Sequence, residues 1–390
     1  MGDVILHAGR DRAVRRRHPW VLSGAVARVD GAPAPGDAVR VLSAEGEVLG
    51  HGHFSPRSDL RVRLFAFGKE APEDGWIARR VAAAVAFRAG QPLLAGTDAV
   101  RLVNAEGDGL PGLVVDRYGD VVVVRASAAG ALVRREEIAR AVRDATGAAA
   151  GLARDDATAA RREGLPAAQG PLWGDAPAGP VSVREAGRSY RVDVRGGQKT
   201  GFYLDQRDAR ELVARLASGR RVLDLFAYTG GFAVAALAGG AAEATAVESS
   251  KEAGALAAAN LAEAGGAERA RLVAGDAFRF LRGSGPDYDL VVVDPPPLAR
   301  RAGDVARATR AYKDLLLHAL RRSAPGGLVL GFACSHHVGP DLFRKVAFAA
   351  SLDAGRPAQV LRTLETPVDH AVSLDHPEGR YLTGLLLRVP

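Results

Sequence analysis

A cysteine and an aspartate each follow an apolar run that is typical of a β-strand. Cys334 is the only cysteine among 390 residues and comes after the run Leu328 to Phe332, while Asp294 follows Tyr288 to Val293. A thiolate can add to C6 of a pyrimidine, which turns C5 into a carbon nucleophile able to take a methyl group. Asp294 can hydrogen-bond N3 of a cytosine and stabilise the charge that develops there. The two residues therefore have the groups needed for methylation at C5 of a cytosine.

This chemistry also needs a base that removes the C5 proton, and the sequence does not identify one. His336 and His337 are candidates for that role or for contact with phosphate, and polar helix-entry residues are the plain alternative. For Cys334 the alternative is a buried, inert thiol, the usual state of a free cysteine. Two adjacent histidines beside one thiol have poor spacing for zinc, and a single cysteine excludes a cysteine-based cluster, so we expect no metal.

The stretch from Arg221 to Asn260 has the pattern of a nucleotide-binding unit. An apolar run containing Asp224 leads through the turn Tyr228 to Gly231 into a helical pattern, and a second run ends at Glu248, 18 residues beyond Gly230. A carboxylate at Asp224 would repel a diphosphate but attract an ammonium or sulfonium group. Glu248 suits hydrogen bonds from ribose hydroxyls. S-adenosylmethionine carries both cations and is the expected cofactor, and an ordinary βα turn is the alternative.

Four carboxylates stand at the ends of successive expected strands. They are Asp224, Glu248, Asp276 and Asp294. Strands that alternate with helices imply a parallel sheet that binds ligands at its carboxyl edge. Asp276 is placed there to accept from an adenine amino group. One such carboxylate is often only a helix N-cap, but four in succession favour a ligand site.

A polar, aromatic and glycine-bearing stretch from Gln198 to Arg207 precedes an expected helix from Asp208 to Leu216. Its aromatics follow no apolar periodicity. Phe202 or Tyr203 could lie against the adenine or methionine end of the cofactor. The alternative is packing of an N-terminal hairpin over the sheet edge.

The chain is long enough for about two or three domains of roughly 150 residues. We expect a small β-rich domain over 1–70, a central α+β domain over 71–180 and an α/β domain over 181–390. The expected elements of the first two are strands Val4 to Leu6, Ala38 to Leu42, Leu60 to Phe65, Val100 to Asn104, Leu113 to Tyr118 and Val121 to Ala126, and helices Trp76 to Ala89 and Ala131 to Ala145.

An arginine cluster precedes an aromatic residue near the N-terminus. Arg12, Arg15, Arg16 and Arg17 come just before Trp20. Such a cluster can hold phosphates while the aromatic stacks on a base. The alternative is a solvated basic loop with Trp20 in the core of the domain.

The net charge of +7 favours a polyanionic partner, but only five of the 52 cationic residues are lysine. That bias suggests GC-rich coding, so local arginine clusters carry more weight than overall charge. No stretch approaches the roughly 20 apolar residues of a membrane span. The N-terminus has charge at once and no apolar signal core, so we expect a cytoplasmic protein.

Taken together, these motifs resemble one family. They are Gln198 to Arg207, Asp224 to Phe232, Asp294-Pro-Pro, Cys334-Ser335, Pro377 to Leu382, the segment Arg-Arg-Arg-His-Pro-Trp ending at Trp20, and Asn104 to Leu113. The chain resembles class I methyltransferases that make 5-methylcytosine in 23S rRNA. The resemblance implies a Rossmann-like α/β methyltransferase domain preceded by a PUA-like β-barrel, which binds RNA, and a central α+β domain. One departure is Pro297, where the family commonly has lysine or a small residue.

The resemblance also implies roles for single residues. Cys334 would be the nucleophile and Asp294 its partner at the base. The expected cofactor contacts are Lys199, Phe202, Asp224, Phe226, Gly230, Glu248, Ser249, Asp276 and Ala277.

We therefore expect an rRNA-processing transferase that moves a methyl group from S-adenosylmethionine to C5 of a cytosine in 23S rRNA. One alternative methylates another RNA atom, such as a guanine nitrogen, without covalent catalysis. A small-molecule methyltransferase fits less well with the two preceding domains. A catalytically inert RNA-binding protein is a further alternative, against which the retained Asp224, Glu248, Asp276, Asp294 and Cys334 speak. The sequence leaves open whether the chain forms a homodimer.

Overall fold

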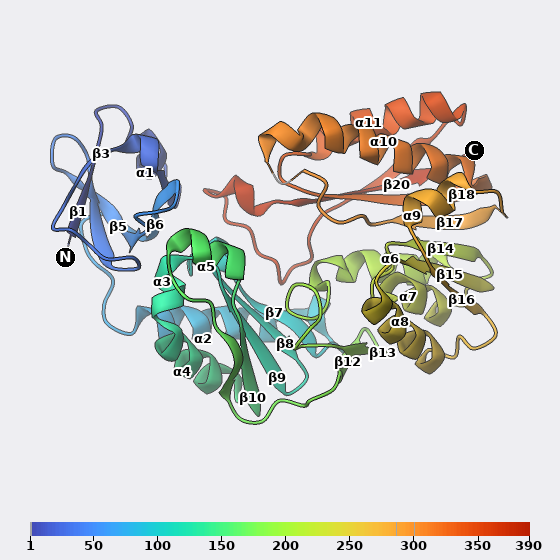
Figure 1. Cartoon of the computed structure of the whole chain (residues 1–390), viewed down its shortest axis with the longest axis horizontal. Coiled ribbons are helices and arrows are strands. Elements are labelled where there is room, and N and C mark those ends of the chain that lie inside the picture. The colour runs from blue at the N-terminus through green and yellow to red at the C-terminus, as the bar shows by residue number, and fades with distance from the viewer. Residues whose placement is uncertain (1, 286, 300) are drawn as a thin grey trace. The chain divides into compact units, whose positions relative to one another are not determined.

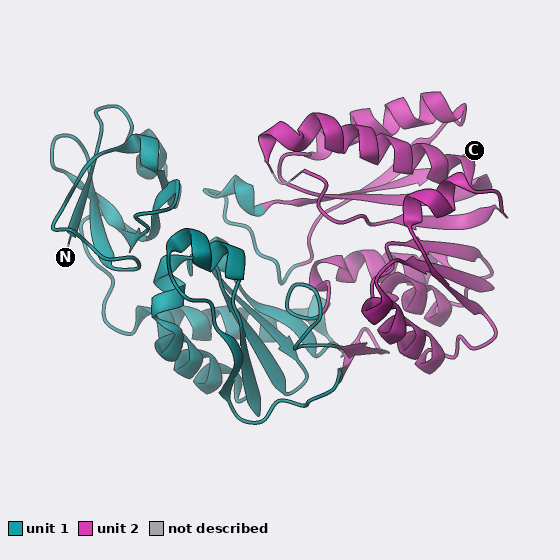
Figure 2. Cartoon of the chain, in the orientation of Figure 1, with its two compact units in different colours: residues 1–181, 193–201, 368–379 teal, residues 182–192, 202–367, 380–390 magenta. Residues whose placement is uncertain are grey.

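The computed structural model describes residues 2–285, 287–299 and 301–390. These form two compact units whose segments interleave along the chain (Figure 2). Unit 1 consists of Met1–Val181, Asp193–Gly201 and Val368–Gly379, and unit 2 of Ser182–Val192, Phe202–Pro367 and Arg380–Pro390. We propose that the PUA-like and central domains both lie in unit 1. No helix among the described residues has the length and apolar character that crossing a membrane requires.

The first part of unit 1 is a six-stranded sheet with the order β2-β6-β5-β4-β1-β3. Its strands are β1 (Gly2–Leu6), β2 (Trp20–Leu22), β3 (Val26–Asp30), β4 (Ala38–Leu42), β5 (Val48–Phe54) and β6 (Leu60–Phe67), with the short helix α1 (Arg12–Arg15) between the first two. Alternate residues face inward, as Val39 and Val41 do in β4, where they pack with Val4 and Val62. The three strands predicted here are confirmed.

The second part of unit 1 is a five-stranded sheet with the order β11-β10-β9-β8-β7. Its strands are β7 (Ala99–Asn104), β8 (Leu113–Tyr118), β9 (Val121–Ala126), β10 (Ala150–Arg154) and β11 (Gln169–Trp173). Its helices are α2 (Trp76–Ala89), α3 (Ala129–Val133), α4 (Arg135–Thr146) and α5 (Ala157–Glu163). Ile77 and Val81 of α2 and Ile138 and Val142 of α4 pack on the sheet in one core.

The single helix predicted over Ala131 to Ala145 is wrong, because the helix breaks at Arg134. Arg134 has φ −104° and ψ 25°, outside helical geometry. Its guanidinium donates to the carbonyl of Gly36 at 2.7 Å and to that of Gly130 at 3.2 Å. The break is thus stabilised by contacts distant in sequence, which local periodicity does not reveal.

Unit 2 contains a seven-stranded sheet with the order β16-β15-β14-β17-β18-β20-β19. Its strands are β14 (Arg221–Leu225), β15 (Glu243–Glu248), β16 (Ala270–Ala274), β17 (Tyr288–Val293), β18 (Ser323–Cys334), β19 (Gln359–Leu364) and β20 (Leu382–Arg388). Strands β14 to β18 run parallel, and β20 is antiparallel to β18 and β19. The chain first proceeds from β14 to β16 and then returns to the other side of β14, so the strand order reverses between β14 and β17.

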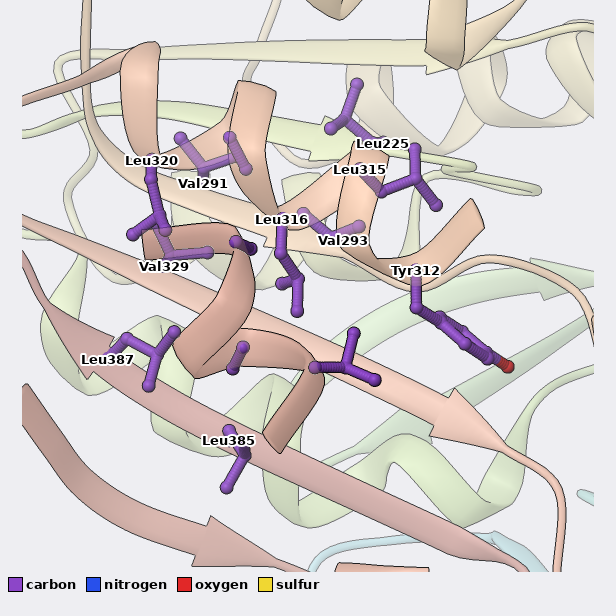
Figure 3. Close-up of a cluster of buried hydrophobic side chains, with 14 of the residues drawn as sticks. Leu225, Val291, Val293, Tyr312, Leu315, Leu316, Leu320, Val329, Leu385 and Leu387 are labelled. Carbon is purple, nitrogen blue, oxygen red and sulfur yellow. The ribbon is translucent and has the colours of Figure 1, made fainter. Parts of the chain in front are cut away.

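Helices cover both faces of this sheet, as Figure 1 shows. They are α6 (Arg207–Leu216), α7 (Gly231–Ala238), α8 (Lys251–Glu263), α9 (Ala277–Arg282), α10 (Val305–Arg321) and α11 (Pro340–Ala354). Val291 and Val293 of β17 pack with α10 on one face (Figure 3), while Leu290 and Val292 pack with α6 and α7 on the other. Burial on both faces explains why β17 is an uninterrupted apolar run instead of an alternating one.

One strand of unit 2 differs from the sequence-based expectation. The strand predicted from Leu328 begins earlier, because β18 starts at Ser323 and runs through Pro325-Gly326-Gly327 with a register shift against β17. A bulge accommodates the proline and glycines that we expected to precede the strand. The sequence also predicts a hairpin from the segments Val181 to Arg184 and Tyr190 to Val194, which is confirmed as the paired strands β12 (Val181–Glu185) and β13 (Arg188–Val192).

Candidate active site

The carboxyl ends of the parallel strands bring the predicted side chains to one edge of the unit 2 sheet. Asp224 lies on β14, Glu248 ends β15, Asp294 follows β17 and Cys334 ends β18. Asp224 and Asp294 flank the point where the strand order reverses. In open α/β sheets the crevice at this point is the usual ligand site.

Asp224 is fully buried and has one oxygen in use. The backbone N–H of Ala233, in the first turn of α7, donates to its Oδ2 at 3.0 Å. Its Oδ1 is buried and, among the described residues, accepts no hydrogen bond. A buried carboxylate oxygen without a donor is unfavourable. The free Oδ1 of Asp224 therefore fits a ligand that brings a hydrogen-bond donor or a positive charge.

The burial of Asp224 has an electrostatic consequence. Burial raises the pKa of Asp224 to about 8, and the nearby Asp294 and Glu248 add to that rise. The carboxyl group is therefore largely neutral at pH 7. A cation beside it would favour its ionised form.

The turn after β14 is hydrogen-bonded to the carboxylate of Glu248. The N–H of Tyr228 donates to Glu248 Oε2 at 2.8 Å, and the N–H of Ser250 donates to Oε1 at 2.7 Å. Phe226 and Tyr228 have positive φ angles of 60° and 51°, and Gly230 has a φ of 80°. Oε1 also accepts from the Ser249 hydroxyl at 3.5 Å. Because a carboxylate oxygen has two lone pairs and Oε2 accepts only from Tyr228 among the described residues, Glu248 can still accept from a ribose hydroxyl.

Four further predicted cofactor contacts lie near the carboxyl ends of the strands, and three of them have a structural role within unit 2. Asp276 is exposed and caps α9, since the N–H of Arg279 donates to its Oδ1 at 2.8 Å. Ala277 is buried as the first residue of that helix, and Ser249 is exposed beside Glu248. The ring of Phe226 meets that of Phe278 edge-on at 5.8 Å. The N-cap alternative for Asp276 is thus realised, and contacts of these residues with the cofactor remain predictions.

Cys334 and Asp294 lie next to each other, as the sequence predicts. The Cys334 thiol donates to Asp294 Oδ1 over 3.7 Å between sulfur and oxygen. Cys334 is half-buried, so its sulfur is not sealed in the core. The geometry lets a proton pass from the thiol to the carboxylate as the sulfur becomes a nucleophile.

The loop after β18 is anchored beside this pair. Ser335 donates through its hydroxyl to the carbonyl of Ala299 at 2.7 Å, which ties the loop to the segment after Asp294. His336 is exposed and His337 half-buried, with ring centroids 3.8 Å apart. Their part in proton removal remains a prediction.

An aromatic residue absent from our expected contacts, Tyr203, joins the site. Burial and the nearby carboxylates of Asp294 and Asp205 raise the pKa of Tyr203, so its phenol stays protonated. Its ring meets that of Tyr228 edge-on at 5.3 Å. The sequence offered Tyr203 only as an alternative to Phe202.

Phe202 has a packing role. Only 2% of it is exposed, and its ring lies 5.2 Å from that of Tyr190 and under the guanidinium of Arg210 at 4.3 Å. These contacts favour the packing alternative over the expected cofactor contact. Arg210 in turn donates to the backbone carbonyl of Tyr203 at 2.9 Å, so this cluster positions the neighbouring tyrosine.

Sequence reasoning missed Tyr312 on α10, a buried side chain of the core cluster in Figure 3. Its phenol lies close enough to Cys334 to interact with it electrostatically. Burial, together with the nearby Cys334, raises the pKa of Tyr312 to about 12. Its position on an ordinary amphipathic helix gives no local signal of proximity to the site.

Lys199 belongs to unit 1 and is described there. It has a positive φ of 53°, and its carbonyl accepts from Arg125 at 3.4 Å. The adjacent Thr200 donates to Asp116 Oδ2 at 2.5 Å. These contacts fasten the segment to the central sheet of unit 1, and its contact with the cofactor remains a prediction.

The predicted RNA-binding residues also lie in unit 1. Arg12, Arg15, Arg16 and Arg17 are all exposed. Arg15 pairs with Asp11 at 2.6 Å and with Glu47 at 2.7 Å, and Arg17 pairs with Asp375 at 3.4 Å.

Trp20 is half-buried and engaged within unit 1. Its Nε1–H donates to Glu106 Oε1 at 2.9 Å, and its ring lies 4.4 Å from that of His376. Both partners lie outside the N-terminal domain, and Trp20 is not among the described core residues of that domain. Stacking of Trp20 on a base remains a prediction.

A comparison with protein-family models decides the family. Residues 136–371 match the model of S-adenosylmethionine-dependent methyltransferases, and residues 4–67 match a PUA-like domain. The chain belongs to the S-adenosylmethionine-dependent methyltransferase family. S-adenosylmethionine is therefore its cofactor. The contacts of Asp224 and Glu248 with its cationic and ribose ends remain predictions.

Relatives of this methyltransferase cover its whole length. A protein of Klebsiella pneumoniae named ribosomal RNA large subunit methyltransferase I is 38% identical over 392 residues, 99% of this chain and 98% of the relative. Its namesake in Aeromonas hydrophila is 40% identical over 393 residues, 99% of each chain.

Solved structures show the same fold. A protein from Streptococcus mutans described as a candidate SAM-dependent methyltransferase aligns over 100% of both chains with a TM-score of 0.84 and 24% identity. A methyltransferase complexed with SAH aligns over the same extent with a TM-score of 0.85 and 23% identity.

Proposed function

We propose that this methyltransferase transfers a methyl group from S-adenosylmethionine to C5 of a cytosine in large-subunit rRNA, through a transient bond between Cys334 and the base. The observation that carries the proposal is the 3.7 Å contact between the Cys334 sulfur and Asp294 Oδ1 at the carboxyl edge of the sheet. A methyltransferase that acts on a nucleophilic base nitrogen has no need of a thiol. A cytosine C5 needs one, because the ring carbon is not nucleophilic until C6 is attacked.

The contact allows proton and electron movements that balance. The Cys334 thiol passes its proton to Asp294, and the sulfur forms a bond with C6. The electrons of the C5–C6 double bond move through the ring to N3, which takes the proton from Asp294. C5 then holds the electron density that accepts the methyl group, which S-adenosylmethionine supplies when bound.

The product forms when the sulfur leaves. A base removes the proton from C5, the C5–C6 double bond returns and the bond between sulfur and C6 breaks. N3 gives its proton back to Asp294, which passes it to the departing Cys334 thiolate and so restores the resting pair. His336 and His337 are our candidates for the base because they follow Cys334 directly in the chain.

The choice of large-subunit rRNA as the substrate is supported by other observations than the Cys334–Asp294 contact. The relatives in Klebsiella and Aeromonas are named for ribosomal RNA of the large subunit, and the PUA-like domain precedes the methyltransferase part. The exposed Arg12 and Arg16, for which no hydrogen bond or ion pair of the side chain is found among the described residues, can contact phosphates. We propose 23S rRNA as the substrate, which places the reaction in the cytoplasm.

The test is to transfer a labelled methyl group to large-subunit rRNA and identify the modified nucleoside. We expect 5-methylcytidine with the unaltered protein and none with Cys334→Ala, while the variant still binds S-adenosylmethionine. We expect Asp294→Asn to lower the rate about a hundredfold or more, as removal of a proton-transfer group does. A labelled guanosine would instead support methylation of a guanine nitrogen, and no labelled RNA at all would support the inert RNA-binding alternative.

A further inference from the structure

A cavity in unit 1 is lined by residues of two motifs that the methylation chemistry does not use, and by a residue that comes just before a third. Its volume is about 360 Å³. Arg17 and Pro19 come from the arginine-rich motif before Trp20, and Glu106 and Gly109 from the motif Asn104 to Leu113. Asp375, just before the motif that begins at Pro377, completes the wall. Cavities that bind small ligands begin at roughly 300 Å³, so a single nucleotide is of the right size.

Arg80 gives this cavity an unsatisfied positive charge. The side chain is half-buried on α2, and its guanidinium lies 4.9 Å over the ring of Trp76. Its Nη1 donates to the carbonyl of Gly109 at 2.5 Å. No carboxylate of the described ranges pairs with Arg80, and burial lowers its pKa. A partly buried cation without a counter-charge is unfavourable, so an anion at Arg80 would be stabilising.

Arg17 supplies a second guanidinium at the same cavity. It lies 4.9 Å over the ring of Phe67, and its Nε is 3.4 Å from Asp375 Oδ2. The flat face of a guanidinium held on an aromatic ring is a surface on which RNA bases stack. Glu106 and Asp375 add acceptors for the N–H groups at a base edge. The cavity thus offers a site for phosphate, a stacking surface and acceptors.

We propose that this cavity binds one unpaired nucleotide of the RNA substrate, with its phosphate on Arg80 and its base against Arg17. A diffuse basic surface would attract RNA at any arginine. The cavity instead predicts that Arg80 contributes far more than its neighbours. The proposal rests on RNA being the substrate, as proposed above.

The variants compare two adjacent arginines of α2. Arg80→Met removes the charge and keeps the packing on Trp76, and Arg80→Lys restores the charge. Arg79→Met is the matched control, because Arg79 is exposed and pairs with Glu73 outside the cavity. Ser373→Phe fills the cavity without a change of charge. Thermal unfolding and binding of S-adenosylmethionine show whether each variant is folded.

We expect Arg80→Met and Ser373→Phe to weaken binding of an rRNA fragment to the intact protein by about tenfold or more, as loss of a specific contact does. Arg80→Lys should recover most of this loss, and Arg79→Met should change affinity only about two- to threefold, as loss of a non-specific charge does. Guanosine 5′-monophosphate should bind the unaltered protein and not Arg80→Met.

Equal losses for Arg79→Met and Arg80→Met, or no binding of the monophosphate, would overturn the proposal. Direct binding of the monophosphate does not depend on methyl transfer. Failure of this site is therefore distinguishable from a wrong assignment of the methylated atom, which the nucleoside analysis detects separately.

Discussion

Arg210 and Glu185 form a bidentate ion pair inside unit 2, with 2.7 Å between Nε and Oε1 and 2.6 Å between Nη2 and Oε2. Both side chains are almost fully buried. The same guanidinium holds the carbonyl of Tyr203, so the pair connects the β12–β13 hairpin to the active-site edge. This ion pair was not visible in the sequence, where the two residues are 25 positions apart.

Removal of one partner of this pair should destabilise unit 2. We expect Glu185→Gln to lower the free energy of unfolding by about 3 to 5 kcal/mol, because it removes the buried counter-charge of Arg210. The same carboxylate also lies 3.6 Å from the buried Arg207 guanidinium, which loses this partner too. Urea denaturation measures the change. The double variant Glu185→Leu with Arg210→Met should lose less. Asp341→Asn, which breaks the exposed pair with Lys345, is the control and should have little effect. An equally small effect of Glu185→Gln would contradict the role of the ion pair.

Cofactor binding should depend on pH through Asp224. The pKa of about 8 leaves the carboxyl mostly protonated near neutrality, and a bound cation requires its ionised form. Affinity for S-adenosylmethionine should therefore rise by up to about tenfold between about pH 6 and about pH 7, with release of a proton. Calorimetry in buffers of different ionisation enthalpy measures both the affinity and the number of protons released. Asp224→Asn should bind more weakly at either pH and show no such dependence. A pH dependence that survives in this variant would assign it to another group.

The same carboxyl group affects the stability of the cofactor-free protein. The pKa of Asp224 is raised from its ordinary value of 3.8, so the folded state binds more protons than the unfolded state between pH 3.8 and about 8. Its contribution to stability is therefore lost as the pH rises through that range. Asp224→Asn should show a smaller loss of stability between about pH 5 and about pH 8 in denaturation measurements.

His53 should make unit 1 sensitive to acid. Burial lowers the pKa of His53 from 6.5 to about 3, and its ring lies 4.5 Å from that of Phe65. The unfolded state then binds the proton more readily, so stability present above pH 6.5 is lost as the pH falls toward 3. At about pH 4 the loss from this group is about 3 kcal/mol. Denaturation of His53→Leu should show a shallower acid dependence, and identical curves would contradict the assignment.

The exposed arginines of the N-terminal domain should differ in their effect on RNA binding. Arg15 already pairs with Asp11 and Glu47, whereas Arg12 and Arg16 have no such partners among the described residues. Arg16→Ala should weaken rRNA binding and reduce the slope of affinity against salt by about 1. Arg15→Ala should have a smaller effect in the same titrations. The reverse order would show that the ion pairs of Arg15 open on binding.

The active-site edge could be predicted because parallel strands place their carboxyl ends together. Asp224 lies within an apolar run, Glu248 ends the next, and Asp294 and Cys334 each follow one. The sheet brings these side chains to one edge. The contact of Cys334 with Asp294 confirms the expected pairing.

Other features depend on contacts between distant segments. The break at Arg134 requires the carbonyl of Gly36, and the approach of Tyr312 to Cys334 requires α10 to pack on the finished sheet. Trp20 was ambiguous because its partners, Glu106 and His376, lie far along the chain. Periodicity reports which face of an element is buried, but it does not report which partner covers that face.

The covalent bond between Cys334 and the target base is the most direct test of the proposed mechanism. An rRNA fragment with 5-fluorocytidine at the target position is incubated with the protein and S-adenosylmethionine. Because fluorine at C5 cannot leave as a proton would, the bond between sulfur and C6 should persist. Mass spectrometry should find the nucleotide on the peptide that contains Cys334, and Cys334→Ala should form no adduct. Undiminished methylation of ordinary rRNA by Cys334→Ala, with no adduct on the unaltered protein, would contradict the mechanism.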